Sequence, residues 1–96
     1  MEIESIRHKG LRRFFETGNP KGLVGAVDRI RKMLAFIVAA ESIDELATPP
    51  NYGLHPLTGD RIGTWAMTVT RNWRMTFEMN EQGALEEMDL EDYHGA

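Results

Sequence analysis

The sequence predicts an α+β fold in which two helices pack on one face of a small, largely antiparallel sheet. Three observations predict it. Apolar residues recur at helical spacing within residues 7–40, and they occupy every second position within residues 65–79. A third alternating segment follows at residues 85–90. The order of one short strand, two helices and three strands is typical of an α+β arrangement.

The chain has 96 residues and no internal repeat, which predicts one domain over residues 1–96. It contains no cysteine, so the chain has neither a disulfide framework nor a thiolate metal site. The first ten residues lack the apolar core of a signal peptide. The longest apolar run, residues 33–40, is far shorter than the ~20 residues that span a bilayer. We therefore expect a soluble, cytoplasmic protein that does not bind membranes.

Charge is distributed unevenly along the chain. The net charge is −4, but residues 1–32 contribute +4 and residues 33–96 contribute −8. The overall acidity argues against loose binding of nucleic acid by the whole surface, because affinity for phosphate comes from cationic side chains. A basic face made by the first third of the chain remains compatible with these totals.

Residues 1–6 alternate weakly and predict a short strand at the sheet edge, with Ile3 buried. Residues 7–16 predict a helix, since an apolar stripe is opposed by basic side chains. The stripe consists of Leu11, Phe14 and Phe15. Gly18 is expected to end this helix, and His8 is expected to lie on its basic surface.

A long second helix is predicted over residues 19–40. Asn19 is a suitable cap and Pro20 a suitable first helical residue. The apolar positions at helical spacing are Val24, Val27, Ile30, Leu34, Ile37 and Val38. Gly22 and Gly25 each lower the helix propensity by about 1 kcal/mol relative to alanine, so packing must supply the difference.

Ser42 and Glu45 form a capping-box pattern, which predicts a short helical turn through Leu46. Two prolines follow and should end it. Residues 51–63 are rich in glycine and proline and are predicted to form a loop.

The segment 65–79 predicts a hairpin whose register follows from parity. A two-residue turn would pair Val69 with Arg74 and place a charge on the apolar face. A three-residue loop, residues 70–72, avoids this. The predicted pairs are Val69 with Trp73, Met67 with Met75 and Trp65 with Phe77. Arg74 then lies opposite Thr68 on the polar face, our name for the side that carries Thr68, Arg74 and Thr76.

A third strand is predicted at residues 85–90, after a turn at residues 80–83. Met88 and Leu90 are expected to point inward. The two predicted helices would therefore cover the apolar face of the sheet and leave the polar face open.

Three segments together resemble a known family. They are HKGLRRFFETG at residues 8–18, YGLHPLTGDRIGTWAMTVTRNWRMTF at residues 52–77, and EDYH at residues 91–94. In this order they resemble the HigB branch of the RelE/ParE superfamily, the toxins of type II toxin-antitoxin systems. The resemblance implies a small twisted sheet with two helices on one face.

The resemblance also implies an activity and partners. Relatives are ribosome-dependent endoribonucleases that cleave messenger RNA in the ribosomal A site. A helix-turn-helix antitoxin, HigA-like, holds the toxin silent, and the complex is expected to bind operator DNA through the antitoxin. Two alternatives remain: a non-catalytic module that only pairs with an antitoxin, and a gyrase-directed toxin as in the ParE branch.

Metal-free RNA cleavage needs a base for the 2′-OH, a cation for the phosphate and an acid for the 5′-oxygen. His55 is a candidate acid or base, because histidine exchanges protons near neutral pH. Arg74 could bind the scissile phosphate with its planar guanidinium, and Arg61 could bind a neighbouring phosphate. In the resembled family the D-Y-H segment is catalytic, which implies roles for Asp92, Tyr93 and His94.

The same resemblance makes His55 and Asp92 the leading acid/base pair, with the two roles unassigned. His55, Asp92 and His94 could also be proposed as metal ligands, but their spacing matches no metal motif, so we expect no metal and no cofactor. One departure stands out: Thr58 occupies a position where relatives often carry lysine, which removes one phosphate contact.

Overall fold

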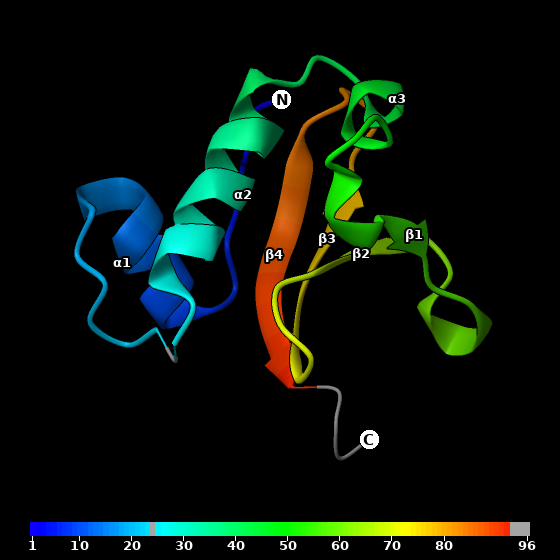
Figure 1. The fold of residues 1–96 in the computed structure, drawn as a ribbon. Coiled ribbons are helices and arrows are strands. Elements are labelled where there is room, and N and C mark those ends of the chain that lie inside the picture. Colours follow the sequence, from blue (N-terminus) through cyan, green and yellow to red (C-terminus); the bar gives the residue numbers. More distant parts are fainter. Residues whose placement is uncertain (24, 93–96) are drawn as a thin grey trace.

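Three helices and a four-stranded antiparallel sheet make up the fold in the computed structural model, which describes residues 1–23 and 25–92 (Figure 1). The helices are α1 (Lys9–Thr17), α2 (Val27–Ala39) and α3 (Ile43–Leu46). The strands are β1 (His55–Pro56), β2 (Thr64–Thr68), β3 (Trp73–Met79) and β4 (Leu85–Asp92). Two 3₁₀ turns, η1 (Asn51–Gly53) and η2 (Gly59–Arg61), flank β1. The strand order is β1-β2-β3-β4, and each neighbouring pair is antiparallel.

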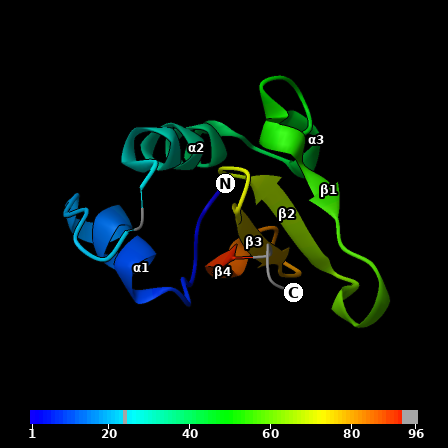
Figure 2. The same ribbon diagram turned by 60° about the horizontal axis from the view of Figure 1, so that its bottom comes forward.

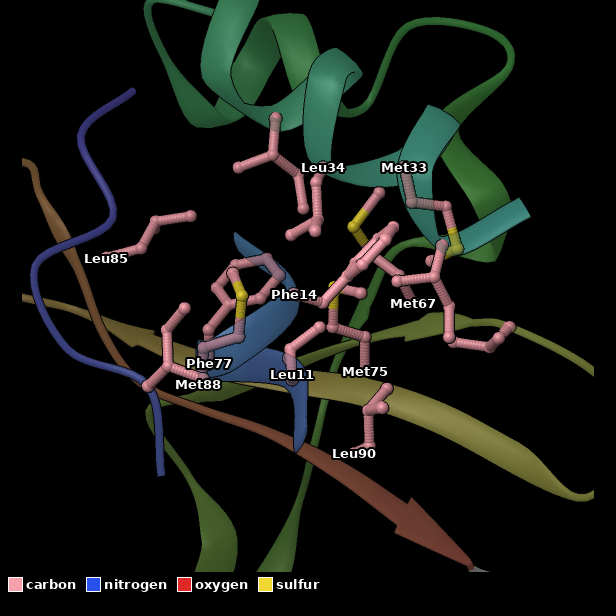
Figure 3. Close-up of a cluster of buried hydrophobic side chains, with 14 of the residues drawn as sticks. Leu11, Phe14, Met33, Leu34, Met67, Met75, Phe77, Leu85, Met88 and Leu90 are labelled. Carbon is pink, nitrogen blue, oxygen red and sulfur yellow. The ribbon is translucent and has the colours of Figure 1, made fainter. Parts of the chain in front are cut away.

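The helices lie on one side of the sheet (Figures 1 and 2). Their buried apolar side chains form one cluster with the alternating apolar residues of the strands. This core contains Leu11, Phe14, Met33, Leu34, Met67, Met75, Phe77, Leu85, Met88 and Leu90, all of them buried (Figure 3). The predicted α+β class, with helices on one face of a largely antiparallel sheet, is confirmed.

The hairpin has the register that parity predicts. Trp65 pairs with Phe77, Met67 pairs with Met75, and Thr68 pairs with Arg74. The backbone N–H of Val69 donates to the carbonyl oxygen of Trp73 (3.0 Å), which completes the predicted set. The charged residue therefore stays off the apolar face, as the cost of burying an unpaired charge requires.

A β-bulge in β4 explains a break in its alternation. Leu85 and Met88 are three residues apart, so a regular strand would direct them to opposite faces, yet both are fully buried. The register shifts by one residue between Thr76 and Glu78, and Glu87 adopts a positive φ of 55°. The extra residue at the bulge returns the apolar side chains to the core.

The N-terminal segment is not a strand, contrary to the prediction for residues 1–6. It makes two isolated parallel bridges along β4, from Ile3 to Leu85 and from Ile6 to Met88. Ile6 is buried, whereas Ile3 is only half-buried. The bridges follow the edge of β4, and the bulge between Leu85 and Met88 prevents a continuous ladder.

Helix α1 ends at Gly18 as predicted, where φ is 79° and the N–H of Gly18 donates to the carbonyl oxygen of Phe14 (2.8 Å). His8 does not lie within the helix. It is the N-cap residue, and its Nδ1 accepts the backbone N–H of Leu11 (3.0 Å). Among the described residues, none of the helices combines the length and apolar character that crossing a bilayer requires.

The prediction of a long helix over residues 19–40 is wrong at its start, because α2 begins at Val27. Gly22 (φ 96°) and Gly25 (φ 60°) adopt left-handed conformations that a helix cannot contain. Gly22 is also pressed against α1, since a Cβ on Gly10 would overlap the carbonyl oxygen of Gly22. The residue expected near the start of the helix therefore lies in a loop against α1.

The residues expected to start that helix form a turn instead. The side chain of Asn19 accepts the backbone N–H of Lys21 (2.9 Å), a local bond that competes with helix formation. Val24, expected on the apolar face of the helix, lies outside the described residues. Half of the predicted capping box of α3 is present, because Ser42 Oγ accepts the N–H of Glu45 (3.3 Å). The Glu45 carboxylate accepts the N–H of Glu41, one residue before the N-cap Ser42.

Candidate functional site

The polar face of the sheet gathers charged side chains from distant segments of the chain. Register places Thr68, Arg74 and Glu91 in one row across β2, β3 and β4. Thr76 and Asp89 face each other in the next row. Because alternate residues of a strand share a face, these side chains all lie opposite the helices.

Arg61, at the end of η2, binds Glu91 on this face through two hydrogen bonds. Its Nη1 donates to Oε1 (2.6 Å) and its Nη2 donates to Oε2 (2.7 Å), which is the bidentate geometry of a strong ion pair. Arg74 Nη2 approaches Oε1 at 3.3 Å, and Thr76 Oγ1 donates to Oε2 at 2.6 Å. We call these four residues the Glu91 cluster.

The hydrogen bonds of the Glu91 cluster shift the pKa values of two of its members. The hydrogen bonds from Arg61 lower the pKa of Glu91 to about 2, against the opposing effect of burial and with further help from Thr76 and Arg74. The same hydrogen bonds raise the pKa of Arg61. The cluster itself therefore holds two guanidinium groups and one carboxylate, and carries one excess positive charge.

His55 lies on β1 at the edge of the sheet, not in a loop as predicted. It pairs with Ala66, which in turn pairs with Thr76, so register assigns His55 to the polar face. Pro56 is compatible with this strand because β1 lies at the sheet edge, where the missing N–H of proline leaves no ladder bond unmade. The N–H of Leu57 also donates to the carbonyl oxygen of Thr64 (2.8 Å).

The imidazole of His55 is exposed, and it contacts a backbone carbonyl within the described part of the chain. Its Nδ1 lies 2.8 Å from the carbonyl oxygen of Gly53. A carbonyl oxygen only accepts, so this contact places a proton on Nδ1 and leaves Nε2 of the neutral ring as an acceptor. Such a ring is oriented to take a proton at Nε2.

The segment that precedes His55 is attached to α2 by aromatic contacts. The Tyr52 ring meets Phe36 edge-to-face, with 5.6 Å between ring centroids. The Arg29 guanidinium lies 5.1 Å from the centre of the Tyr52 ring, and its Nη2 donates to the carbonyl oxygen of Thr68 (3.2 Å). Helix α2, η1 and the end of β2 are thereby joined, which restricts the position of β1.

Of the three C-terminal candidates, Asp92 alone is among the described residues. Asp92 is the last residue of β4 and pairs with Trp73, so strand alternation directs this position toward the face of the sheet that carries the helices. Register therefore brings His55 and Arg74 to the polar face, and the ion pair with Glu91 brings Arg61 there, but register does not bring Asp92 to that face. Tyr93 and His94 lie outside the described residues.

Glu91 is the site residue that the sequence motifs did not single out. Its position was recoverable, because Leu90 is apolar and the next residue of a strand must point to the opposite face. The identity of its partners was not recoverable, since Arg61 reaches it from a loop 30 residues away. Within residues 1–23 and 25–92, no group of three His, Cys, Asp or Glu side chains is arranged to hold a metal ion.

The fold and the cluster define a class: a small α+β protein whose helices cover one face of a sheet and whose other face presents arginines able to bind an anion. Residues 4–94 match the family model described as the RelE-like toxin of type II toxin-antitoxin system HigB. The chain belongs to this family, and the resemblance drawn from its motifs is confirmed. A toxin of a type II system has an antitoxin as its partner.

Two known proteins illustrate the relationship. The chain is 45% identical over 93 residues to the protein named Endoribonuclease HigB of Proteus vulgaris, and the match covers 96% of this chain and 99% of that protein. The crystal structure of YafQ from E. coli strain BL21(DE3) superimposes with a TM-score of 0.63 at 11% identity, and covers 99% of this chain and 97% of YafQ. The second similarity concerns the fold alone.

Proposed function

We propose that this toxin is an endoribonuclease that cleaves messenger RNA on the ribosome. The observation that carries the proposal is the convergence of Arg61 and Arg74 on the polar face, to which register also assigns His55. Guanidinium groups bind phosphate in a planar, bidentate manner, and a cationic site of this kind suits the backbone of RNA. The name of the relative from Proteus vulgaris agrees with this chemistry.

The proposed reaction needs no metal ion. A base removes the proton of the 2′-OH, and the resulting oxygen attacks the adjacent phosphorus. The P–O5′ bond breaks, the 5′-oxygen receives a proton from an acid, and the upstream fragment keeps a 2′,3′-cyclic phosphate. Arg74 would stabilise the negative charge that grows on the phosphate, and Arg61 would hold a neighbouring phosphate.

His55 is the leading candidate for proton transfer, because Nε2 is the ring nitrogen that its contact with Gly53 leaves available. Tyr93 and His94 complete the proposed catalytic set on the strength of the family resemblance. Asp92 is included on that resemblance alone, because register directs its position toward the face that carries the helices. We propose no division of acid and base roles among them.

The proposed partners follow from family membership. A HigA-like helix-turn-helix antitoxin would silence the toxin, and the complex would bind operator DNA through the antitoxin. The ribosome and messenger RNA would be the targets in the cytoplasm.

The decisive experiment combines the purified protein with ribosomes that translate a defined message. We expect cleavage, with a 2′,3′-cyclic phosphate on the upstream fragment. A message that carries a 2′-deoxy nucleotide at the mapped position should remain intact there, because it lacks the attacking oxygen. His55→Ala should abolish cleavage while circular dichroism remains that of the parent protein.

Other outcomes would point to the alternative functions. Uncut message in the presence of active ribosomes, together with normal growth of cells that express the toxin alone, would favour a non-catalytic partner of the antitoxin. Growth arrest with uncut message and inhibited DNA supercoiling would favour a gyrase-directed toxin.

A further inference from the structure

We propose that Glu91 is a positioning residue, which holds Arg61 and Arg74 at the spacing needed to bind the RNA phosphates. The inference rests on the proposed nuclease function and assigns a role to a carboxylate within its cationic site. A negative charge beside a phosphate site requires an explanation, because by itself it repels the substrate.

The geometry shows what the carboxylate does. Oε1 accepts from Arg61 (2.6 Å) and approaches Arg74 (3.3 Å), so one oxygen joins guanidinium groups that come from η2 and β3. The two guanidinium groups carry like charges and would repel each other without the carboxylate between them. Oε2 accepts the second bond from Arg61 and the bond from Thr76, which fixes the plane of the carboxylate.

The exposed fractions of the side chains distinguish two roles for Glu91. It could position the arginines, or it could act as a plug, a carboxylate that occupies the phosphate site until RNA displaces it. The Glu91 side chain is 20% exposed, whereas that of Arg61 is 38% exposed. Thr76 beneath them is 2% exposed. An approaching phosphate therefore meets Arg61 before Glu91. A guanidinium has five N–H donors, and Arg61 directs two of them to Glu91, so phosphate can bind without breaking the ion pair.

The test compares three substitutions in β4. Glu91→Gln removes the charge and puts an amide N–H₂ against a guanidinium. We expect kcat for ribosome-dependent cleavage to fall at least 10-fold, with a smaller change in KM. Glu91→Asp keeps the charge on a shorter side chain and should recover part of the activity. Glu86→Gln is the matched control, because it makes the same charge change in the same strand and should leave kcat unchanged.

A binding measurement gives a second readout that does not depend on cleavage. Inorganic phosphate is titrated while the Nε–Hε signals of Arg61 and Arg74 are followed by NMR. In the parent protein both signals should shift with one common Kd. In Glu91→Gln we expect that Kd to rise at least threefold, and the two signals should no longer move together.

The outcomes separate this inference from the proposed function. Loss of kcat and of phosphate binding in Glu91→Gln supports the inference. Faster cleavage or tighter phosphate binding would identify Glu91 as a plug and overturn it, as would equal values in all variants. If the parent protein does not cleave message, the nuclease proposal fails, and the phosphate titration alone still decides whether Glu91 positions the two arginines.

Discussion

The two faces of the sheet are built on different physical principles, although they share the same strands. On the apolar face, Met75 and Phe77 are fully buried against helices, and their contribution depends on volume and contact. On the polar face, Arg74 is 21% exposed and its position depends on charge pairing with Glu91. The comparison teaches that neighbouring residues of β3 serve stability and binding separately, so substitutions should divide the two properties.

The largest effect is expected from the apolar face. Phe77→Ala should lower the free energy of unfolding by about 3–5 kcal/mol, because it leaves a cavity in a densely packed core. Thr76→Val changes the adjacent residue on the polar face and should cost about 1.5–3 kcal/mol, the net value of one hydrogen bond to a charged group. Urea denaturation of both variants measures the difference, and equal losses would contradict the division between the faces.

The next effect concerns activity. Arg74→Lys keeps the charge but loses the planar fork, so we expect message cleavage to fall about 10²-fold, equivalent to about 2.7 kcal/mol in transition-state stabilisation. The free energy of unfolding should change by less than about 1 kcal/mol. Arg71→Lys, in the exposed hairpin turn, is the matched control and should cleave as the parent does. An Arg74→Lys variant with parental activity would remove Arg74 from the site.

A smaller effect is expected from acid. The pKa of Glu91 is lowered from 4.5 to about 2 in the folded protein, so its ionised form favours folding. This contribution is complete above pH about 4.5 and is lost as the pH falls toward 2. With allowance for solvent screening at this partly exposed site, we expect it to amount to about 1–2 kcal/mol.

The measurement is the difference in unfolding free energy between the parent protein and Glu91→Gln at several pH values. The difference should shrink between pH 4.5 and pH 2, because the variant has no carboxylate to protonate. A difference that stays constant over this range would mean that the ion pair with Arg61 does not stabilise the fold in solution.

The smallest effect on stability is expected at the N-cap of α3, away from both faces of the sheet. Ser42→Ala removes the acceptor for the N–H of Glu45 and should cost about 1 kcal/mol, as helix caps typically do. Ser42→Asp should restore most of this stability, since aspartate also caps helices. Thermal unfolding of the pair tests the assignment, and a larger loss than that of Thr76→Val would contradict it.

Much of the fold could be predicted because it depends on local patterns. The hairpin register followed from the rule that Val69 and Trp73 must share a face, and Gly18 ended α1 because the chain needed a left-handed residue there. The start of α2 could not be predicted in the same way. Left-handed conformations at Gly22, Gly25 and Ala26 precede α2, and helical spacing of apolar residues does not report them.

The candidate site likewise has one part that local sequence patterns predict and one part that depends on long-range contacts. The sequence by itself determined that Arg74 lies on the polar face, because side-chain alternation and turn parity are properties of neighbouring residues. The tertiary structure alone decided that Arg61 reaches across the sheet to Glu91, and that β4 continues past Leu90 so that Glu91 pairs with Arg74 and Asp92 pairs with Trp73. These arrangements arise from the pairing of strands and loops far apart in the chain, which short-range spacing does not encode.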